Sequence, residues 1–364
     1  MSTELTRRKA LQSLALWLAA SPLLDGQDAP PKLIGEPPGR ITPVDELVNV
    51  LEAEAMAQRL LSSPLYAKIA GSDRSFFARM TLQPSMMIDV RKLDMSLDLL
   101  GTKMFAPILL GPSSRQQRFH PDGEIETARG ALAAQAVMVI SSRSSQPVAR
   151  VAAEAKQAWY QAYPQSDMAP VLARVQEAVQ AGCHAVCLTV GTPYQPTGSS
   201  GAPSPTALEK FGNPAMDWTV VDRVRQAAKV PVLLKGIMTA EEARTAVERG
   251  VEGIVVSNHG GRFIEGLVNP VEVLPAIVDA VGGNIPVLVD GSFRRGTDIM
   301  SALGLGARAV LVARPPLWGL AAYGAEGVQT VMEMLQSETA RTMALCGTIN
   351  LAAIKRNVVR IHSR

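Results

Sequence analysis

The stretch VEGIVVSNHGGR, residues 251–262, decides the predicted fold. Its first half is apolar and rich in β-branched residues, which is typical of a parallel strand buried on both faces. The run then stops at a turn that carries one imidazole, His259, and one guanidinium, Arg262. The two glycines between them let the backbone approach a ligand closely. The stretch therefore predicts a buried strand that ends at a binding site.

His259 and Arg262 together suit an acidic organic substrate. A guanidinium can hold a carboxylate through two parallel hydrogen bonds, while a neighbouring imidazole accepts a proton. Lone histidines are more often structural, and we interpret His120, His184 and His362 in that way. The Ser, Asn and Gly neighbours of His259 fit neither a core segment nor an ordinary turn. We predict His259 as a catalytic residue and Arg262 as a substrate-binding residue.

Around this strand the chain alternates short apolar segments with amphipathic helical patterns. Eight strands are predicted, at residues 108–110, 137–140, 158–163, 185–190, 232–235, 253–256, 287–289 and 309–312. Gly182, Gly250 and Gly306 mark turns between helices such as residues 240–249 and the strands that follow. Eight strand–helix repeats favour an α/β fold closed into a (β/α)8 TIM barrel over an open sheet. No G-x-G-x-x-G follows the first strand, which argues against a dinucleotide-binding fold.

Composition excludes several other classes of protein. The 364 residues are 47% hydrophobic and 19% charged, which is an ordinary globular composition. The net charge of +3 comes from scattered Lys and Arg, so we expect no nucleic-acid partner. Cys183, Cys187 and Cys346 are too few and too irregularly spaced for a disulfide framework or a metal site. We predict that they are small core residues and that the protein holds no metal.

The N-terminus predicts a targeting signal. Arg7 and Arg8 precede a short apolar segment, residues 14–20, in a pattern that resembles a twin-arginine export signal. The segment is too short for a stable membrane span. The expected location is therefore periplasmic by the twin-arginine route, and otherwise cytoplasmic with an ordinary N-terminal helix.

Three parts of the chain follow from these patterns. Residues 1–30 are the signal segment, residues 31–100 a linker with an N-terminal helical extension and a plug, and residues 101–364 the barrel. The extension is predicted as a helix over 42–71, with Thr42 as its cap and Pro43 in its first turn. Its apolar positions with helical spacing are Val44, Leu47, Val48 and Leu51. Short strands at residues 86–90 and 97–100 are expected to plug the lower end of the barrel.

Two motifs carry a resemblance to a known family. They are SNHGGRF at residues 257–263 and VDGSFRRGTDIMSALGLGARAVLVARP at residues 289–315. They resemble the FMN-dependent α-hydroxy-acid oxidases and dehydrogenases, which include glycolate oxidase, lactate oxidase and flavocytochrome b2. The resemblance covers most of the chain from Met86 onward. It implies an FMN-binding homo-oligomer that oxidises a small 2-hydroxy acid to the 2-oxo acid and passes electrons to oxygen or another acceptor.

Ligand groups of such barrels lie at the carboxyl ends of the strands, which predicts the cofactor contacts. These are Pro112, Ser113, Ser114, Ser141, Gln161, Thr189, Lys235, Ser257, Asp290, Gly291, Ser292, Arg294, Ala313 and Arg314. A lysine at the end of an apolar strand is costly unless it meets negative charge, so Lys235 is predicted to stabilise the reduced ring. The loops after strands seven and eight commonly bind phosphate, and the resemblance assigns that contact to Arg294 and Arg314.

The resemblance implies four further roles. Gln161 would contact the flavin, Asp290 the ribityl chain, and Tyr163 the substrate during catalysis. Tyr66 is the candidate for a second substrate-binding tyrosine on the N-terminal helices. The segment that follows Tyr66 is shorter than in the family pattern.

Two departures from the family pattern leave alternatives open. The family carries an aspartate beside the catalytic histidine in a segment like LTVDTP, and this chain has Gly191 there. The family's second substrate arginine has no counterpart either, since residues 194–205 form a Pro/Gly/Ser-rich loop. One alternative is an FMN barrel oxidoreductase with another substrate. The other is a flavin-binding protein of low activity.

Restoring the carboxylate tests the first departure. We expect Gly191→Asp to speed anaerobic flavin reduction by lactate or glycolate, because an aspartate that steadies an imidazole is worth up to about 10⁴ in rate in the serine-protease triad. Stopped-flow absorbance measures this rate. An unchanged rate would contradict the role given to the lost carboxylate.

Overall fold

The strand predicted at the centre of the chain lies in a closed ring of eight parallel strands. The computed structural model describes residues 40–165, 167–190, 217–261 and 268–363. The ring contains β4 (Ile108–Leu110), β5 (Met138–Ser141), β6 (Ala158–Ala162), β7 (Cys183–Thr189), β8 (Val232–Ile237), β9 (Gly253–Val256), β10 (Val287–Asp290) and β11 (Ala309–Val312). Each strand pairs with the next in sequence, and β11 closes the ring on β4. The predicted (β/α)8 barrel is confirmed.

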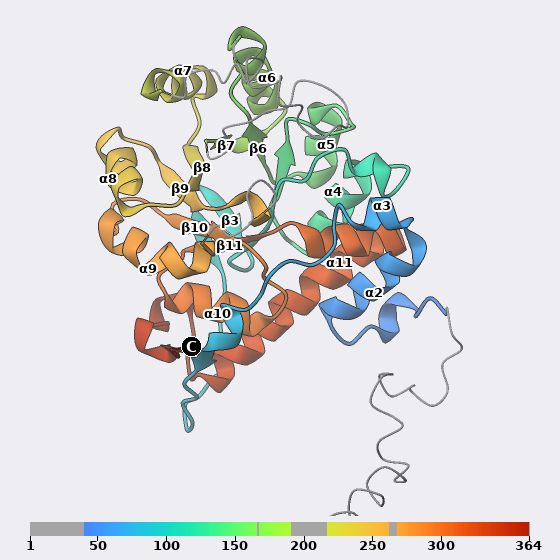
Figure 1. Ribbon diagram of the computed structural model, residues 1–364, viewed down its shortest axis with the longest axis vertical. Helices are drawn as coiled ribbons and strands as arrows, with labels where there is room; N and C mark the ends of the chain where they lie inside the picture. Colours follow the sequence, from blue (N-terminus) through green and yellow to red (C-terminus); the bar gives the residue numbers. More distant parts are fainter. Residues whose placement is uncertain (1–39, 166, 191–216, 262–267, 364) are drawn as a thin grey trace, which may run out of the picture. The chain divides into compact units, whose positions relative to one another are not determined.

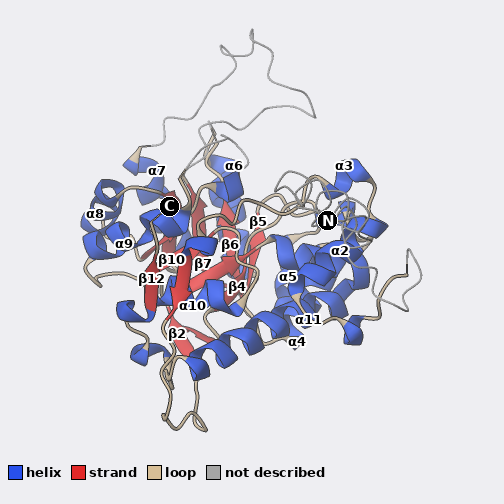
Figure 2. Ribbon diagram, turned by 60° about the horizontal axis from the view of Figure 1, so that its bottom comes forward, coloured by secondary structure: helices blue, strands red, loops and turns tan. Residues whose placement is uncertain are grey.

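Helices surround the ring of strands (Figures 1 and 2). They are α4 (Glu124–Ala133), α5 (Val148–Ala155), α6 (Ala169–Gln180), α7 (Trp218–Ala228), α8 (Ala240–Glu248), α9 (Pro270–Val281), α10 (Gly296–Gly304) and α11 (Arg314–Leu345). Local sequence explains where they begin and end. Thr239 and Glu242 form a capping box at the start of α8, while Gly182, Gly250 and Gly306 take positive φ in the predicted turns.

The N-terminal extension is helical, but it differs from the prediction. It contains the 3-10 helix η1 (Val44–Glu46), then α2 (Val50–Leu60), α3 (Ser63–Tyr66) and the 3-10 helix η2 (Phe77–Arg79). Thr42 was the wrong cap, because the side chain of Asn49 accepts the hydrogen bond from Leu51 N at the start of α2. Val48 is 78% exposed, so the predicted apolar stripe is also wrong.

Two small antiparallel sheets complete the strands. β2 (Leu97–Leu99) pairs with β3 (Thr102–Met104), and β1 (Met80–Leu82) pairs with β12 (Val359–Ile361). The predicted strand at residues 86–90 is wrong. Met86 is largely exposed and Met87 fully exposed. Their apolar side chains therefore do not form the buried face that stabilises a strand in a sheet.

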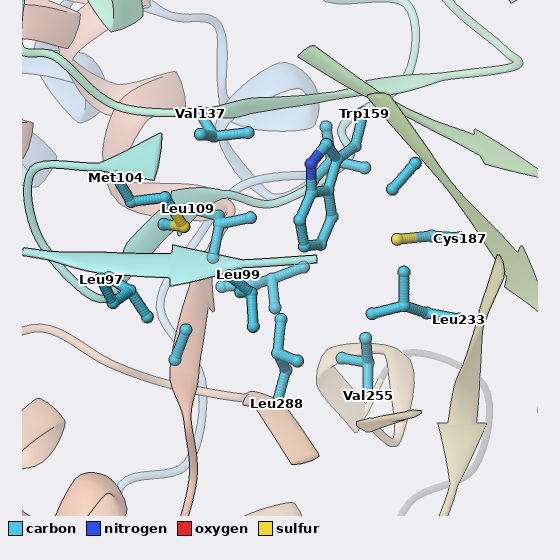
Figure 3. Packing of buried hydrophobic residues seen from close by; sticks show 14 residues of the cluster. Leu97, Leu99, Met104, Leu109, Val137, Trp159, Cys187, Leu233, Val255 and Leu288 are labelled. Atoms are coloured by element: carbon cyan, nitrogen blue, oxygen red, sulfur yellow. The ribbon is translucent and has the colours of Figure 1, made fainter. Parts of the chain in front are cut away.

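The β2–β3 hairpin closes one end of the barrel, as the sequence predicted. Figure 3 shows side chains of the hairpin, Leu97, Leu99 and Met104, pointing toward the barrel side chains Leu109 and Leu288. The indole of Trp159 donates to Thr102 Oγ1 over 3.0 Å in this buried region. Apolar side chains fill the interior, so the barrel is a packed core and not a pore. Ligands of such barrels bind at the carboxyl ends of the strands.

The three cysteines are buried and unpaired, which confirms their prediction as core residues. Thr42–Arg364 forms one compact unit. The twin-arginine segment falls outside the described residues, and the boundaries at residues 30 and 100 stay predictions. No described helix has both the length and the apolar character that a membrane crossing requires.

Helix α11 contains a close approach of its own backbone. The helix is kinked at Gly324, where φ is 61°. A Cβ atom on Gly319 would lie 2.2 Å from the carbonyl oxygen of Gly327, so only glycine fits at this contact. Trp318 is fully buried next to it. The contact between Gly319 and Gly327 therefore holds the first turns of α11 in position. This helix begins directly after β11, at the carboxyl ends of the barrel strands.

We expect Gly319→Ala to lower the free energy of unfolding by about 1–3 kcal/mol, since the new methyl group overpacks a backbone contact. Urea unfolding followed by circular dichroism measures it. The matched control is Gly111→Ala, because a Cβ there meets its nearest neighbour at 3.4 Å. Equal effects of the two substitutions would contradict the close approach.

Candidate active site

A cavity of about 380 Å³ lies at the carboxyl ends of the barrel strands. Fourteen of the residues predicted from the sequence line it: Pro112, Ser113, Ser114, Ser141, Tyr163, Thr189, Lys235, His259, Asp290, Gly291, Ser292, Arg294, Ala313 and Arg314. They come from all eight barrel strands and the turns that follow them, which no single stretch of sequence brings together. Parallel closure of the barrel places them around one space.

Gln161 is buried beside the cavity and does not line it. Its amide donates to Thr189 Oγ1 over 2.7 Å, and its carbonyl oxygen accepts from Ser141 Oγ over 3.2 Å. The chain of hydrogen bonds spans β5, β6 and β7. It orients the two hydroxyl groups that do face the cavity, Ser141 and Thr189.

Lys235 and Asp290 form a buried ion pair at the centre of the site. Lys235, at 5% exposure, extends from β8, and its Nζ lies 2.6 Å from Asp290 Oδ2 at the end of β10. The same ammonium donates to Ser257 Oγ over 2.8 Å. Ser257 is therefore an indirect contributor, since it does not line the cavity. Among the described residues Asp290 Oδ1 is buried without a hydrogen-bond partner.

His259 follows β9 in a tight turn with positive φ. Its backbone N–H donates to Ser257 Oγ over 3.1 Å, which joins it to the Lys235 group. The pKa of His259 is lowered to about 4 by burial first and by the positive charge of Lys235 second, while Asp290 acts in the opposite direction. The imidazole is therefore neutral at pH 7 and able to accept a proton.

Arg294 and Arg314 bring two positive charges to the site from the segments that follow β10 and β11. Arg294 is 3% exposed, lies 4.5 Å over the ring of Trp318, and donates to Phe293 O. Its pKa is lowered to about 10 by burial and then by the charge of Arg314. Arg314 Nη2 donates to Gly260 O over 2.9 Å. Two cations held this close, one of them buried, form a site for an anion.

Arg294 Nη2 supports this interpretation. Within the described part of the chain it is buried and has no hydrogen-bond partner. A buried donor without a partner is costly, and a ligand oxygen would satisfy it.

A segment ahead of the barrel also reaches the cavity, and the sequence did not predict it. Lys68, Ile69 and Ser72 line the cavity. Ser72 Oγ lies 2.6 Å from Ser292 Oγ, and Arg74 donates twice to Asp298. The contact depends on residues more than 200 positions apart, so no local pattern could reveal it.

Tyr66 is not one of the residues that line the cavity. Its hydroxyl donates to Glu54 Oε1 over 3.2 Å within the N-terminal extension. The structure therefore gives no support to Tyr66 as a substrate-binding residue. Arg262 and Gly191 lie outside the described residues.

Arg118 and Arg143 also line the cavity without having been predicted. Both follow strand ends, Arg118 in the 3-10 helix η3 (Gln116–Arg118) after β4 and Arg143 in the turn after β5, and both segments are polar. Position after a barrel strand was the signal that could have identified them.

Comparison with known proteins identifies the family. A family model described as FMN-dependent dehydrogenase matches residues 68–201 and 195–361. The chain belongs to the FMN-dependent dehydrogenase family. It is 36% identical over 349 residues to a peroxisomal (S)-2-hydroxy-acid oxidase of Oryza sativa subsp. japonica, covering 86% of this chain and 95% of that protein.

Further relatives of this FMN-dependent dehydrogenase support the same family assignment. Glycolate oxidase 3 of Arabidopsis thaliana is 35% identical over 356 residues, covering 86% of this chain and 96% of that protein. A crystal structure of mandelate oxidase superposes with a TM-score of 0.80 at 33% identity, covering 87% of this chain and all of that one.

The cavity fits FMN, the cofactor of this family. A buried guanidinium donor at Arg294, next to the second cation Arg314, suits a phosphate. The buried oxygen of Asp290 suits a hydroxyl donor such as those of a ribityl chain. These two groups belong to one molecule, and both protein partners face one cavity of this FMN-dependent dehydrogenase.

The lowered pKa of His259 predicts a pH dependence of stability. An unfolded chain protonates histidine near pH 6.5, whereas the folded protein does so only near pH 4. Between these values the unfolded state binds more protons, so the contribution of His259 is present above pH 6.5 and is lost as the pH falls. In flavin-free protein, His259→Gln should therefore lose less stability than wild type between pH 7 and 5.

Urea unfolding at the two pH values measures this difference. His184→Gln, at an exposed position of β7, is the control and should behave as wild type. A wild-type-like loss in the His259 variant would contradict the lowered pKa.

Proposed function

We propose that this FMN-dependent dehydrogenase oxidises a small 2-hydroxy acid to the corresponding 2-oxo acid. The observation that supports it best is one cavity with a neutral histidine, a buried lysine–aspartate pair and an arginine pair suited to phosphate. The named relatives, a 2-hydroxy-acid oxidase, a glycolate oxidase and a mandelate oxidase, support the same substrate class.

Several groups of the cavity would hold the cofactor. Arg294 and Arg314 would bind the phosphate, and Asp290 a hydroxyl of the ribityl chain. Smaller contacts would come from the polar turns and strand ends: Pro112, Ser113, Ser114, Ser141, Thr189, Gly291, Ser292 and Ala313. FMN, when bound, accepts the two electrons that the substrate loses.

His259 would act as the base. Oxidation of a CH–OH group to C=O removes two electrons and two protons; the neutral imidazole would accept one proton, and the other would go to the flavin with the two electrons. Lys235 would offer fixed positive charge where negative charge develops, because its ammonium is buried and already oriented by Ser257 and Asp290. Tyr163 would contact the substrate from the end of β6, and Arg262 would bind its carboxylate.

A flavin-binding protein of low activity is the second candidate function. The low pKa of His259 favours it, since the site does little to stabilise the protonated imidazole that catalysis produces. Flavin reduction by hydroxy acids distinguishes the two. Bleaching by a hydroxy acid supports the enzyme, whereas bleaching by chemical reductants or light alone supports the second candidate.

We expect the purified protein to be yellow and to lose its flavin absorbance when lactate or glycolate is added without oxygen. His259→Gln should keep the flavin and slow its reduction by about 10²–10⁴, the usual contribution of general-base catalysis. Anaerobic stopped-flow absorbance measures both. A colourless protein that takes up no FMN would contradict the proposal.

Arg294→Met should weaken FMN binding by about 10- to 100-fold, because one charge-assisted hydrogen bond is lost. Fluorescence titration of flavin-free protein with FMN measures the affinity. Arg308→Met, at an exposed position away from the cavity, is the matched control. Equal affinities of the two variants would contradict a phosphate contact at Arg294.

Three further properties stay predictions from the sequence. They are export by the twin-arginine route, a homo-oligomeric state, and transfer of electrons to oxygen or another acceptor. Cell fractionation addresses export, light scattering addresses the oligomeric state, and mixing the reduced flavoprotein with oxygen or with another acceptor addresses electron transfer.

A further inference from the structure

The charge of the cavity exceeds what FMN and one carboxylate require. Among the described residues, six cationic side chains line the cavity and one carboxylate, Asp290, faces them. Lys235 is paired with that carboxylate, and Arg294 and Arg314 suit the phosphate. Lys68, Arg118 and Arg143 belong to neither group, and of these three Arg143 is held over the ring of Tyr163. Arg143 is therefore a candidate binding residue for an anion other than the FMN phosphate.

Arg143 is held at the cavity by an aromatic ring. It follows β5, and its guanidinium carbon lies 4.5 Å from the centre of the Tyr163 ring at the end of β6. Its carbonyl oxygen accepts from Arg115 N over 3.0 Å, which ties its loop to the one after β4. An arginine stacked on a ring keeps the edge of its guanidinium open for a carboxylate.

Arg143 has no acidic partner in the described part of the chain. Another exposed arginine, Arg129, forms ion pairs with Glu126 and Glu154. Arg143 instead faces the cavity, and its side chain is exposed. Its hydrogen-bond donors are thus available to a ligand.

The order of strands places Arg143 far from the other predicted carboxylate-binding position. In the closed ring β5 lies four strands from β9 in either direction, so the two strand ends face each other across the cavity. His259 follows β9, and so does Arg262 in the sequence. A substrate whose reacting end lies at His259 would extend its other end toward β5.

We propose that Arg143 is a specificity-determining residue that binds a second negative group of the substrate. The substrate class is then a 2-hydroxydicarboxylic acid, with one carboxylate next to the hydroxyl-bearing carbon and another at its far end. This inference rests on the proposed 2-hydroxy-acid oxidation. It adds a preference between diacids and monoacids, which the family membership leaves open.

The test compares matched pairs of substrates. Anaerobic flavin reduction is measured with 2-hydroxysuccinate and 2-hydroxyglutarate and with the monoacids lactate and 2-hydroxybutyrate. We expect wild type to prefer the diacids, and Arg143→Gln to lower the diacid-to-monoacid ratio of kcat/KM by about tenfold or more, since a charge-assisted hydrogen bond is lost. Arg143→Lys should retain part of the preference, because the charge remains.

Arg150→Gln is the matched control. Arg150 is an exposed arginine on α5, after the same strand, and it does not line the cavity. Its variant should keep the wild-type ratio. A wild-type preference for monoacids, or an unchanged ratio in Arg143→Gln, would overturn the inference while leaving the oxidation of hydroxy acids intact.

A binding measurement separates this inference from the proposed function. Titration calorimetry of the FMN-loaded protein with succinate and with butyrate should show about tenfold weaker succinate binding in Arg143→Gln and little change for butyrate. If no hydroxy acid reduces the flavin, the proposed function fails, and the calorimetry still decides the role of Arg143. Equal succinate affinities in wild type and variant would refute that role.

Discussion

The site depends on the ion pair between Lys235 and Asp290. Removing both charges from water is costly, and a separation of 2.6 Å with a further hydrogen bond to Ser257 is the geometry that offsets this cost. The pair joins the ends of β8, β9 and β10. Its two charges also act on His259 in opposite directions, the lysine lowering the pKa of the imidazole and the aspartate raising it. A structural contact thus also contributes to the protonation state of the proposed base, for which burial is the larger cause.

The second constraint is the placement of like charges after β10 and at the start of α11. Arg294 is buried against Trp318, and Arg314 stands at the start of the same helix as that tryptophan. The close contact of Gly319 with Gly327 holds this part of α11 in place. The protein therefore uses packing to keep two guanidinium groups together against their repulsion. Such an arrangement is stable when an anion completes it.

The sequence has Gly191 where the predicted family pattern has an aspartate, and this bears on the charges around the proposed base. That segment of the sequence has no aspartate, and Lys235 and Asp290 are two charged groups that act on the pKa of His259. A neutral imidazole is a competent proton acceptor but receives little help in keeping the proton. Arg143, stacked on Tyr163, adds positive charge on the opposite side of the cavity. The cavity therefore combines a histidine that is neutral at pH 7 with an arginine at the opposite strand end.

The amino-acid sequence by itself determined the barrel, the identity of its eight strands and most of the residues at their ends. Strands buried on both faces leave continuous apolar runs, and glycines mark the turns, so local patterns suffice there. The predictions of a helix cap at Thr42 and of a strand at residues 86–90 were wrong. The spacing of apolar residues alone does not show which face of an element packs against the rest of the protein. Only the tertiary structure decided that Tyr66 binds Glu54, that Ser72 reaches the cavity, and that Arg143 stacks on Tyr163. Some of these contacts join distant parts of the chain, and others depend on the direction of a side chain. Contacts of either kind leave no periodic pattern in the sequence.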